Sequence, residues 1–365
     1  MINRVARWMR WMRGSDADAG LPWRIFWIAF AVRVVYITFA HTYHFRTYDE
    51  HFQFGWEAGR IGRALATGRG YADPFGNSYL GHTGATAWLP PLYPLLMAGV
   101  FKVFGVYTSA SAWVLLTINS ALSAGTVLAV WEIAVRCFSR RNAVWSAWLW
   151  ALYPAAMQYA VRWIWEMTLT AAIFAWVIVL ALRMRGIDAG EAAGSKTNPA
   201  TQTGQTARWI LFAVLWAAIA LSNSTLLVFL PVCGVWILMG DWGRRHALRD
   251  AVLAGLVFLA CLAPWEMRNY EVFHAFIPLR GNLGVEAYLG NGPGSNGFLK
   301  AYDHPNLAPN QFRLYAQMGE VRYAKMRGAL AEAYIHAHPG HFAADCAKRI
   351  YFFWAGVPSD ARRAV

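Results

Sequence analysis

Long apolar runs constrain the fold of this 365-residue chain more than any other feature. A helix crosses the roughly 30 Å hydrocarbon core of a bilayer with about 20 residues, and its backbone polar groups are then satisfied internally. Seven segments approach that length: 21–40, 110–135, 143–161, 167–182, 209–221, 226–239 and 251–264. The sequence therefore predicts an all-α polytopic transmembrane bundle of about seven spans, organised as one domain over residues 1–365.

The composition agrees with a bilayer as the solvent of this chain. Hydrophobic residues make up 57% of it and charged residues 15%, whereas soluble domains usually carry about 25% charged residues. The formal net charge is +13, but the basic residues flank apolar segments and form no patch or stripe that would bind nucleic acid. We expect membrane lipids, and no nucleic acid, among its partners.

Neither a zinc site nor a disulfide framework is indicated. The cysteines are scattered without a CxxC spacing, and the histidines show no HExxH spacing. The stretch GNGPGSNG from Gly290 has no preceding strand and no helix at the offset of a phosphate-binding loop, so we interpret it as a turn. The first apolar run, after a basic stretch, is too long and too poorly cleavable for a secretory signal and is expected to be an uncleaved span.

The positive-inside rule decides how the segment 88–104 is placed, since it is apolar but carries three prolines and Lys102. If it crosses the membrane, the basic clusters at 136–141 and 183–185 fall outside; if it does not, all the basic clusters fall inside. We therefore expect a juxtamembrane or re-entrant helix there. The segments 42–109 and 265–345 are then external, and 186–207 is a flexible cytoplasmic linker.

An acidic pair, Asp49 and Glu50, follows the first predicted span and is the main chemical candidate. We expect Thr47 to cap a helix lying on the membrane, which places the pair in its first turn. One face of that helix holds Phe54, Ala58, Ile61 and Leu65. The pair either complements the helix dipole, by about 0.3 to 1 kcal/mol, or acts as a general base. Spacing leaves both interpretations open.

Three sequence blocks occur in an order that resembles one enzyme family. The acidic pair is followed by RALATGRGY and LPPLYPLLMAGVFKVFG, and APWEMRNYEVFHAFIPLRGNLGVEAYLGN comes after the seventh predicted span. From about residue 33 onward, this order resembles the GT-C membrane glycosyltransferases of glycosyltransferase family 39, the protein-mannosyltransferase-like and aminoarabinose-transferase-like branch.

The resemblance implies an inverting transferase that moves a sugar from a polyprenyl-phosphate-linked donor to an envelope lipid, glycan or protein, outside a bacterial inner membrane. It implies Asp49 as the base or metal-linked carboxylate, with Glu50 beside it and Mg or Mn as a candidate cofactor. Pro91 and Tyr93 match the segment beside the site, and Asn269 is expected in the substrate pocket. Leu89 stands where some members carry a lysine.

A lipid-phosphate leaving group calls for cations aimed at its oxygens. Arg268, directly after the seventh predicted span, is the first candidate, followed by Arg162 and Arg280; each is otherwise a snorkelling interfacial side chain. Glu166 lies at the outer end of the fourth predicted span, where a lone carboxylate is costly unless paired. It is expected either to pair with Arg162, four residues earlier, or to contact substrate.

Other functions remain open from the sequence. A transporter would concentrate polar residues and broken helices near the midplane, and only the break at Asn223 and Ser224 favours one. An O-antigen ligase or polymerase would use a large late external loop without the early acidic pair, and a non-catalytic partner would keep only the fold. The last apolar run, 350–357, is too short to span, so we expect a shortened chain or a fragment.

Overall fold

The computed structural model describes residues 20–45, 54–75, 81–187, 202–240 and 246–356. Within these ranges the chain is helical and forms no strand, only an isolated bridge between Ala72 and Ala85. The predicted all-α class is confirmed. Contacts divide the chain into a first unit, Met1–Gly55 with Pro91–Pro264, and a second unit, Trp56–Pro90 with Trp265–Val365.

The predicted seven spans are not confirmed. Four helices of the described chain are long and apolar enough to cross a membrane, which indicates a membrane protein. They are α2 (Leu21–Phe39), α5 (Ser109–Cys137), α8 (Met167–Met184) and α11 (Ala247–Phe273). Shorter apolar helices are α4 (Leu92–Phe104), most of α9 (Gln202–Ala220), and η2 (Ser224–Val228) continued by α10 (Phe229–Gly240).

Two local breaks explain why predicted spans are shortened. The predicted span 143–161 divides into α6 (Arg140–Leu152) and α7 (Pro154–Val161). Pro154 has no N–H to donate and forces the preceding Tyr153 into extended backbone, with ψ 117°. The second break follows α9, where the Asn223 side chain accepts a hydrogen bond from the Thr225 backbone N–H at 3.1 Å and caps η2.

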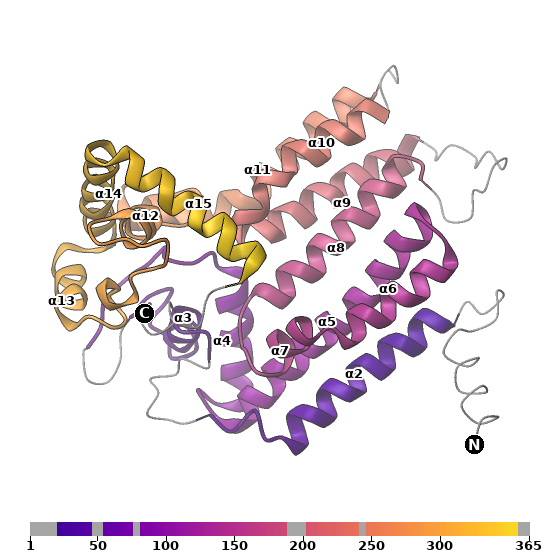
Figure 1. The fold of residues 1–365 in the computed structure, drawn as a ribbon, viewed down its shortest axis with the longest axis horizontal. Helices are drawn as coiled ribbons and strands as arrows, with labels where there is room; N and C mark the ends of the chain where they lie inside the picture. Colours follow the sequence, from indigo (N-terminus) through magenta and orange to yellow (C-terminus); the bar gives the residue numbers. More distant parts are fainter. Residues whose placement is uncertain (1–19, 46–53, 76–80, 188–201, 241–245, 357–365) are drawn as a thin grey trace. The chain divides into compact units, whose positions relative to one another are not determined.

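In the first unit, α5 packs against α2, α6, α7 and α8, and α8 packs against α9 (Figure 1). Small residues let the backbones of α2, α5 and α6 approach closely, among them Ala29, Ala124 and Ala147. Arg33 of α2 is fully buried and donates to the carbonyls of Ala29 at 3.0 Å and Ala151 at 2.9 Å. Ala151 lies near the Pro154 break, where helix carbonyls lack helical partners.

The second unit combines two segments that lie far apart in the sequence. Its helices are α3 (Glu57–Ala66), α12 (Leu283–Asn291), η3 (Ala301–Asp303), α13 (Pro309–Met318), α14 (Glu320–Ala337) and α15 (Pro339–Ala355). Its core joins Phe75 and Trp88 to Val285, Tyr315 and Tyr323. The close crossing of α12 and α14 depends on glycine, because a Cβ on Gly284 would lie 2.1 Å from the Ala324 carbonyl oxygen.

The helix predicted after Thr47 differs from the structure. α3 begins only at Glu57, and Phe54 precedes it, packing on Phe101 and Tyr107 of the first unit. Ala58 and Ile61, predicted to face the membrane surface, are buried inside the protein, and Gly59 and Gly62 are buried as well. α3 is thus buried on more than one face, which a helix lying on a membrane surface would not be.

Candidate functional site

The two residues on which the sequence analysis concentrated, Asp49 and Glu50, lie outside the described residues. Thr47, the expected cap, lies outside them too. Their roles therefore remain predictions, and so does a metal bound at Asp49.

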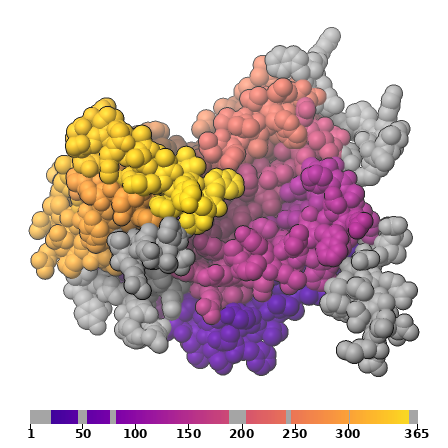
Figure 2. Space-filling view, viewed as in Figure 1, coloured from indigo at the N-terminus to yellow at the C-terminus, as the bar shows by residue number. Residues whose placement is uncertain are grey.

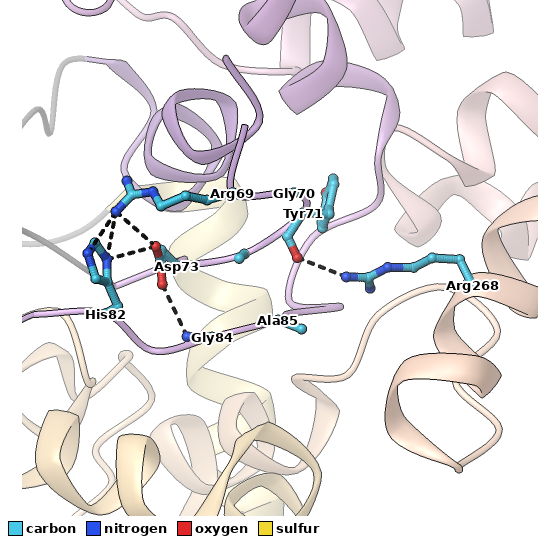
Figure 3. A pocket seen from close by; sticks show the side chains of 9 residues that line it. Arg69, Gly70, Tyr71, Asp73, His82, Gly84, Ala85 and Arg268 are labelled. Atoms are coloured by element: carbon cyan, nitrogen blue, oxygen red, sulfur yellow. Dashed lines mark hydrogen bonds and ion pairs between the residues drawn. The ribbon is translucent and has the colours of Figure 1, made fainter. Parts of the chain in front are cut away.

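An open pocket of about 480 Å³ lies in the second unit, beside the chain that leaves α3 (Figure 3). Residues 69–73 form one wall and residues 82–85 return alongside them. The Asp73 N–H donates to the Gly84 carbonyl at 2.9 Å, and the Thr86 N–H to the Tyr71 carbonyl at 3.1 Å. Gly70 has φ 75°, which permits the turn between α3 and this wall.

Asp73 holds the pocket wall together and is not free to act as a base. Its carboxylate is buried and accepts hydrogen bonds from the backbone N–H groups of Thr83 at 2.9 Å and Gly84 at 3.1 Å. His82 Nδ1 lies 3.0 Å from the Asp73 carboxylate, and the Arg69 guanidinium lies 2.7 Å from Nδ1 and 2.9 Å from Nε2 of the same ring (Figure 3). Four partners, counting the Arg69 guanidinium at 3.5 Å, thus share one carboxylate.

Arg268 approaches the same pocket from α11. Its guanidinium donates to the carbonyls of Thr86 at 2.6 Å and Tyr71 at 2.8 Å, and to the Asn269 side chain at 3.0 Å. It also lies over the rings of Tyr71 and Trp265, 5.3 Å from each centroid. Within the described chain these bonds use three of the five guanidinium N–H groups. The side chain is therefore held in place, and these bonds leave the Nε–H and one Nη2–H unused.

The other predicted residues of the second unit occupy different positions. Asn269 is fully buried, and its amide donates to the Ile277 carbonyl at 2.9 Å, so it orients Arg268 and stabilises the turn after α11. Arg280 donates to the Trp88 carbonyl at 3.4 Å and lines a second groove, of about 660 Å³, with His274. Arg268 and Arg280 thus line different cavities.

Four predicted residues, Pro91, Tyr93, Arg162 and Glu166, belong to the first unit. Pro91 precedes the first turn of α4. Tyr93 is buried, and its hydroxyl receives a hydrogen bond at 3.1 Å from the Asn119 amide, which also donates to the Trp163 carbonyl at 3.1 Å. This network ties α4 to α5.

The expected ion pair between Arg162 and Glu166 is not formed. Arg162 ends α7 and donates instead to the Tyr36 hydroxyl at 3.2 Å. Glu166 is buried at the start of α8 and accepts from the Asn223 amide at 3.4 Å. The pairing assumed one continuous helix, whereas the chain turns out of the helix between the two residues.

Two further buried carboxylates of the second unit, Glu320 and Glu57, were not predicted from the sequence. Glu320 accepts hydrogen bonds from the Thr86 hydroxyl, from the Ala87 N–H at 2.8 Å and from the Tyr315 hydroxyl at 2.7 Å. Burial, the largest cause, raises its pKa, while these donors oppose the shift. Glu320 follows Gly319 in the first turn of α14, where an acidic residue has an ordinary helix-start explanation, so its burial was not visible locally.

Glu57 is the second of these carboxylates, and it links α3 to residues 304–306. It accepts from the Asn306 amide, and the Asn306 side chain accepts in turn from Arg60. His304 lies 3.9 Å from the carboxylate. Burial raises the pKa of Glu57 to about 7 and lowers that of His304 to about 4. The only sequence signal was an acidic residue in the helix predicted around residues 54–65.

The described residues contain no group of three or more His, Cys, Asp or Glu side chains able to hold a metal ion. The stretch from Gly290 begins in the last turn of α12, which ends at Asn291, and Gly294 and Gly297 beyond it have positive φ, so the chain turns there as predicted. Neither feature adds a cofactor site to the described chain.

No protein-family model, curated protein or solved structure matches this chain at a significant level.

Proposed function

We propose that this chain is an integral membrane glycosyltransferase of the bacterial inner membrane. It transfers a sugar from a polyprenyl-phosphate-linked donor to an envelope lipid, glycan or protein on the external face. The proposal joins the sequence resemblance to one structural observation, the pocket lined by Arg69, His82 and Arg268. A membrane protein with a pocket that holds two arginines fits a lipid substrate with a phosphate head.

The charges of this pocket suit an anion. Arg69 and Arg268 bring two positive charges, while the single carboxylate, Asp73, is already shared among the donors that surround it. The surplus is therefore positive, and Arg268 retains N–H groups in a fixed position. Prepositioned cations stabilise charge that develops on a departing phosphate. Some members of the family that the sequence resembles carry a lysine at the position of Leu89. In this chain Arg69 and Arg268 supply that positive charge instead.

In the proposed reaction an acceptor hydroxyl attacks the anomeric carbon of the donor sugar as the bond from that carbon to the phosphate oxygen breaks. The electron pair of that bond leaves with the lipid phosphate, beside Arg268. The hydroxyl proton passes to the Asp49 carboxylate, with Glu50 as its neighbour, and attack from the opposite side inverts the sugar centre. The resemblance adds Mg or Mn at Asp49, but no step here depends on a metal.

An apolar pocket of about 360 Å³ in the first unit supports a lipid-linked donor. It lies at the break between α6 and α7 and is lined mainly by aromatic and small residues, including Trp150, Tyr153, Tyr159 and Met167. Its surface is mostly apolar, as an isoprenoid segment requires. The Pro154 break creates this recess, because α6 and α7 no longer form one continuous cylinder.

A transporter accounts less well for the same observations. The polar cluster that favours it comprises Glu166, Thr170, Ser222 and Asn223, with a 3.0 Å bond between the Thr170 and Ser222 hydroxyls. These residues stand at the beginning of α8 and just beyond the end of α9. Transport sites lie near the bilayer midplane, so a cluster at helix ends fits the edge of a membrane better.

The test is sugar transfer by the full chain in proteoliposomes containing polyprenyl-phosphate sugars. Asp49→Asn should abolish sugar transfer. Arg268→Ala should reduce sugar transfer strongly, although the donor lipid still partitions into the vesicles. Glu332→Gln, on an exposed face of α14, is the matched control and should transfer normally. Unchanged transfer by Asp49→Asn would remove the base assignment, and no transfer from any polyprenyl-linked sugar would refute the proposed function.

Envelope glycolipids compared by mass spectrometry, with and without the gene, separate this activity from that of an O-antigen ligase or polymerase. Loss of a single sugar from a glycolipid or glycoprotein supports the proposed transfer. Loss of whole glycan chains, with the core intact, supports the ligase or polymerase instead.

A further inference from the structure

The last described helix, α15, drawn in yellow in Figure 2, packs against the rest of the second unit through one face only. The His341 side chain forms a hydrogen bond with the Ser295 hydroxyl, and Asp345, one turn later in α15, is buried. Arg349 donates to the Asn291 side chain at 2.9 Å, and the Phe352 ring stacks on Phe298 with centroids 4.9 Å apart. These four positions recur at helical spacing, so they form one face, anchored by both polar and aromatic contacts.

The opposite face of α15 is apolar and uncovered. At 100° per residue, Ala343, Ala347, Ile350 and Trp354 point away from the anchored face, and all four are exposed. Ile350 is 64% exposed and Trp354 81%, with Tyr351 and Phe353 at 62% and 79% beside them. No charged residue lies on this outer stripe of α15.

This group of Ile350, Tyr351, Phe353 and Trp354 is called the aromatic tip below. The Phe353 and Trp354 rings contact each other edge to face, with centroids 5.1 Å apart, so these two members form one apolar surface. Scattered exposed apolar residues are common on proteins, but a continuous apolar patch marks an interaction surface.

The residue types of the tip favour a lipid bilayer as the occupant. Tryptophan and tyrosine are enriched where membranes meet water, because an apolar ring with a polar handle suits that layer. Lys348 precedes the tip, and Arg362 and Arg363 follow it in the sequence, which favours anionic headgroups. The spanning helices of the same chain keep a bilayer within constant reach.

The aromatic tip is too short to cross the membrane, which favours insertion at the membrane surface. The helix ends at Gly356, whose φ of 79° is the left-handed conformation of a helix stop and whose N–H donates to the Phe352 carbonyl at 3.0 Å. The exposed apolar face is thus confined to the final turns, far short of the roughly 20 residues of a span.

We infer that the aromatic tip of α15 inserts into the headgroup region of the membrane and so anchors the second unit to the bilayer surface. This inference uses the membrane-spanning helices but not the proposed sugar transfer. It therefore stands or falls separately from that function.

The experiment measures the depth of α15 in the bilayer. The full chain, with its native cysteines replaced by alanine, is reconstituted in vesicles of phosphatidylethanolamine and phosphatidylglycerol. A nitroxide is attached at Trp354→Cys, and in a second variant at Ile350→Cys; Glu332→Cys, on α14, is the water-exposed control. Power saturation with oxygen and with a nickel chelate then gives the depth of each label.

Labels at 354 and 350 should lie about 5 to 10 Å below the headgroup boundary, as in other interfacial helices, with the control label in water. If both labels lie at this depth in the vesicles with phosphatidylglycerol but not in vesicles of phosphatidylcholine alone, insertion is still supported, and it depends on the charge of the lipid. A label at 354 as accessible to the nickel chelate as the control would overturn the inference. Labels shielded from both oxygen and nickel would also overturn it, because they would indicate a protein partner on this face.

Discussion

Replacing Glu57 by Gln should stabilise the second unit at neutral pH, although it removes a charge from a buried polar cluster. Burial is the largest cause that raises the pKa of Glu57, from 4.5 to about 7, and Glu286 adds to it. Arg60 and Arg280 oppose the shift without cancelling it. The folded chain therefore prefers the protonated carboxyl, whose oxygen still accepts from Asn306.

The size and pH window of the effect follow from this shift. A carboxyl whose pKa is raised by folding contributes stability that is fully present below about pH 4.5 and lost as the pH rises through about 7. At 1.36 kcal/mol per pKa unit the loss is about 3 kcal/mol. Gln keeps the acceptor oxygen and cannot ionise, so Glu57→Gln should match wild type at low pH and exceed it above neutrality.

His304 acts in the opposite direction and hides the effect in the wild-type protein. Its pKa is lowered from 6.5 to about 4, so its contribution is present above pH 6.5 and lost as the pH falls through about 4. The two slopes partly cancel between these values. Comparing Glu57→Gln with wild type at each pH removes the His304 contribution, since both chains carry it.

Hydrogen–deuterium exchange of α3 and residues 301–308 in detergent provides the assay. At about pH 8 these segments should be protected roughly 100-fold more in Glu57→Gln than in wild type, and equally at about pH 4.5. Peptides of α8, in the first unit, are the internal control. Equal protection at both pH values, or weaker protection of the variant at pH 8, would refute the reasoning from burial.

The remaining predictions concern packing and the cationic pocket. Gly284→Ala should lower thermal stability in detergent by about 2 to 3 kcal/mol through overpacking, because its Cβ would meet the Ala324 carbonyl. Gly290→Ala, on the same helix, meets only a side-chain atom at 3.6 Å and should be nearly neutral; equal losses would contradict this. Asp73→Ala should cost about 2 to 4 kcal/mol by stranding two backbone N–H groups, and Asp73→Asn much less, by thermal unfolding. Arg268→Lys should reduce sugar transfer about tenfold or more, since a lysine cannot serve both carbonyls and a phosphate; undiminished transfer would show that the fork geometry is not needed.

Much of the local structure could be predicted from the sequence. The apolar runs mark the helices that are long enough to span. The helix stop before Pro154 was not predicted, and Pro264 lies inside α11 without ending it. The number of spans was harder to predict, because hydropathy reports how long an apolar segment is and not whether it forms one continuous helix. A segment such as 143–161 has the composition of a span but is divided by a single residue.

The candidate site was predictable in part. Arg268 was selected from its position after an apolar run, and the structure places it in a polar pocket of the second unit. Arg69, Asp73 and His82 were not selected, since each is an ordinary loop residue until residues 70–73 and 82–86 lie side by side. Arg162 and Glu166 were expected to pair by helical spacing, which fails where the helix ends between them.

By itself the sequence determined that this chain is helical and that it belongs in a membrane. These properties depend on neighbours within a few turns, so composition and spacing report them. Only the tertiary structure decided that residues 56–90 join residues 265–365 in one unit. The bonds from Arg268 to the Thr86 and Tyr71 carbonyls join positions 182 and 197 residues apart, and no local pattern encodes them. Such contacts form because burying both segments together satisfies polar groups that neither could satisfy alone.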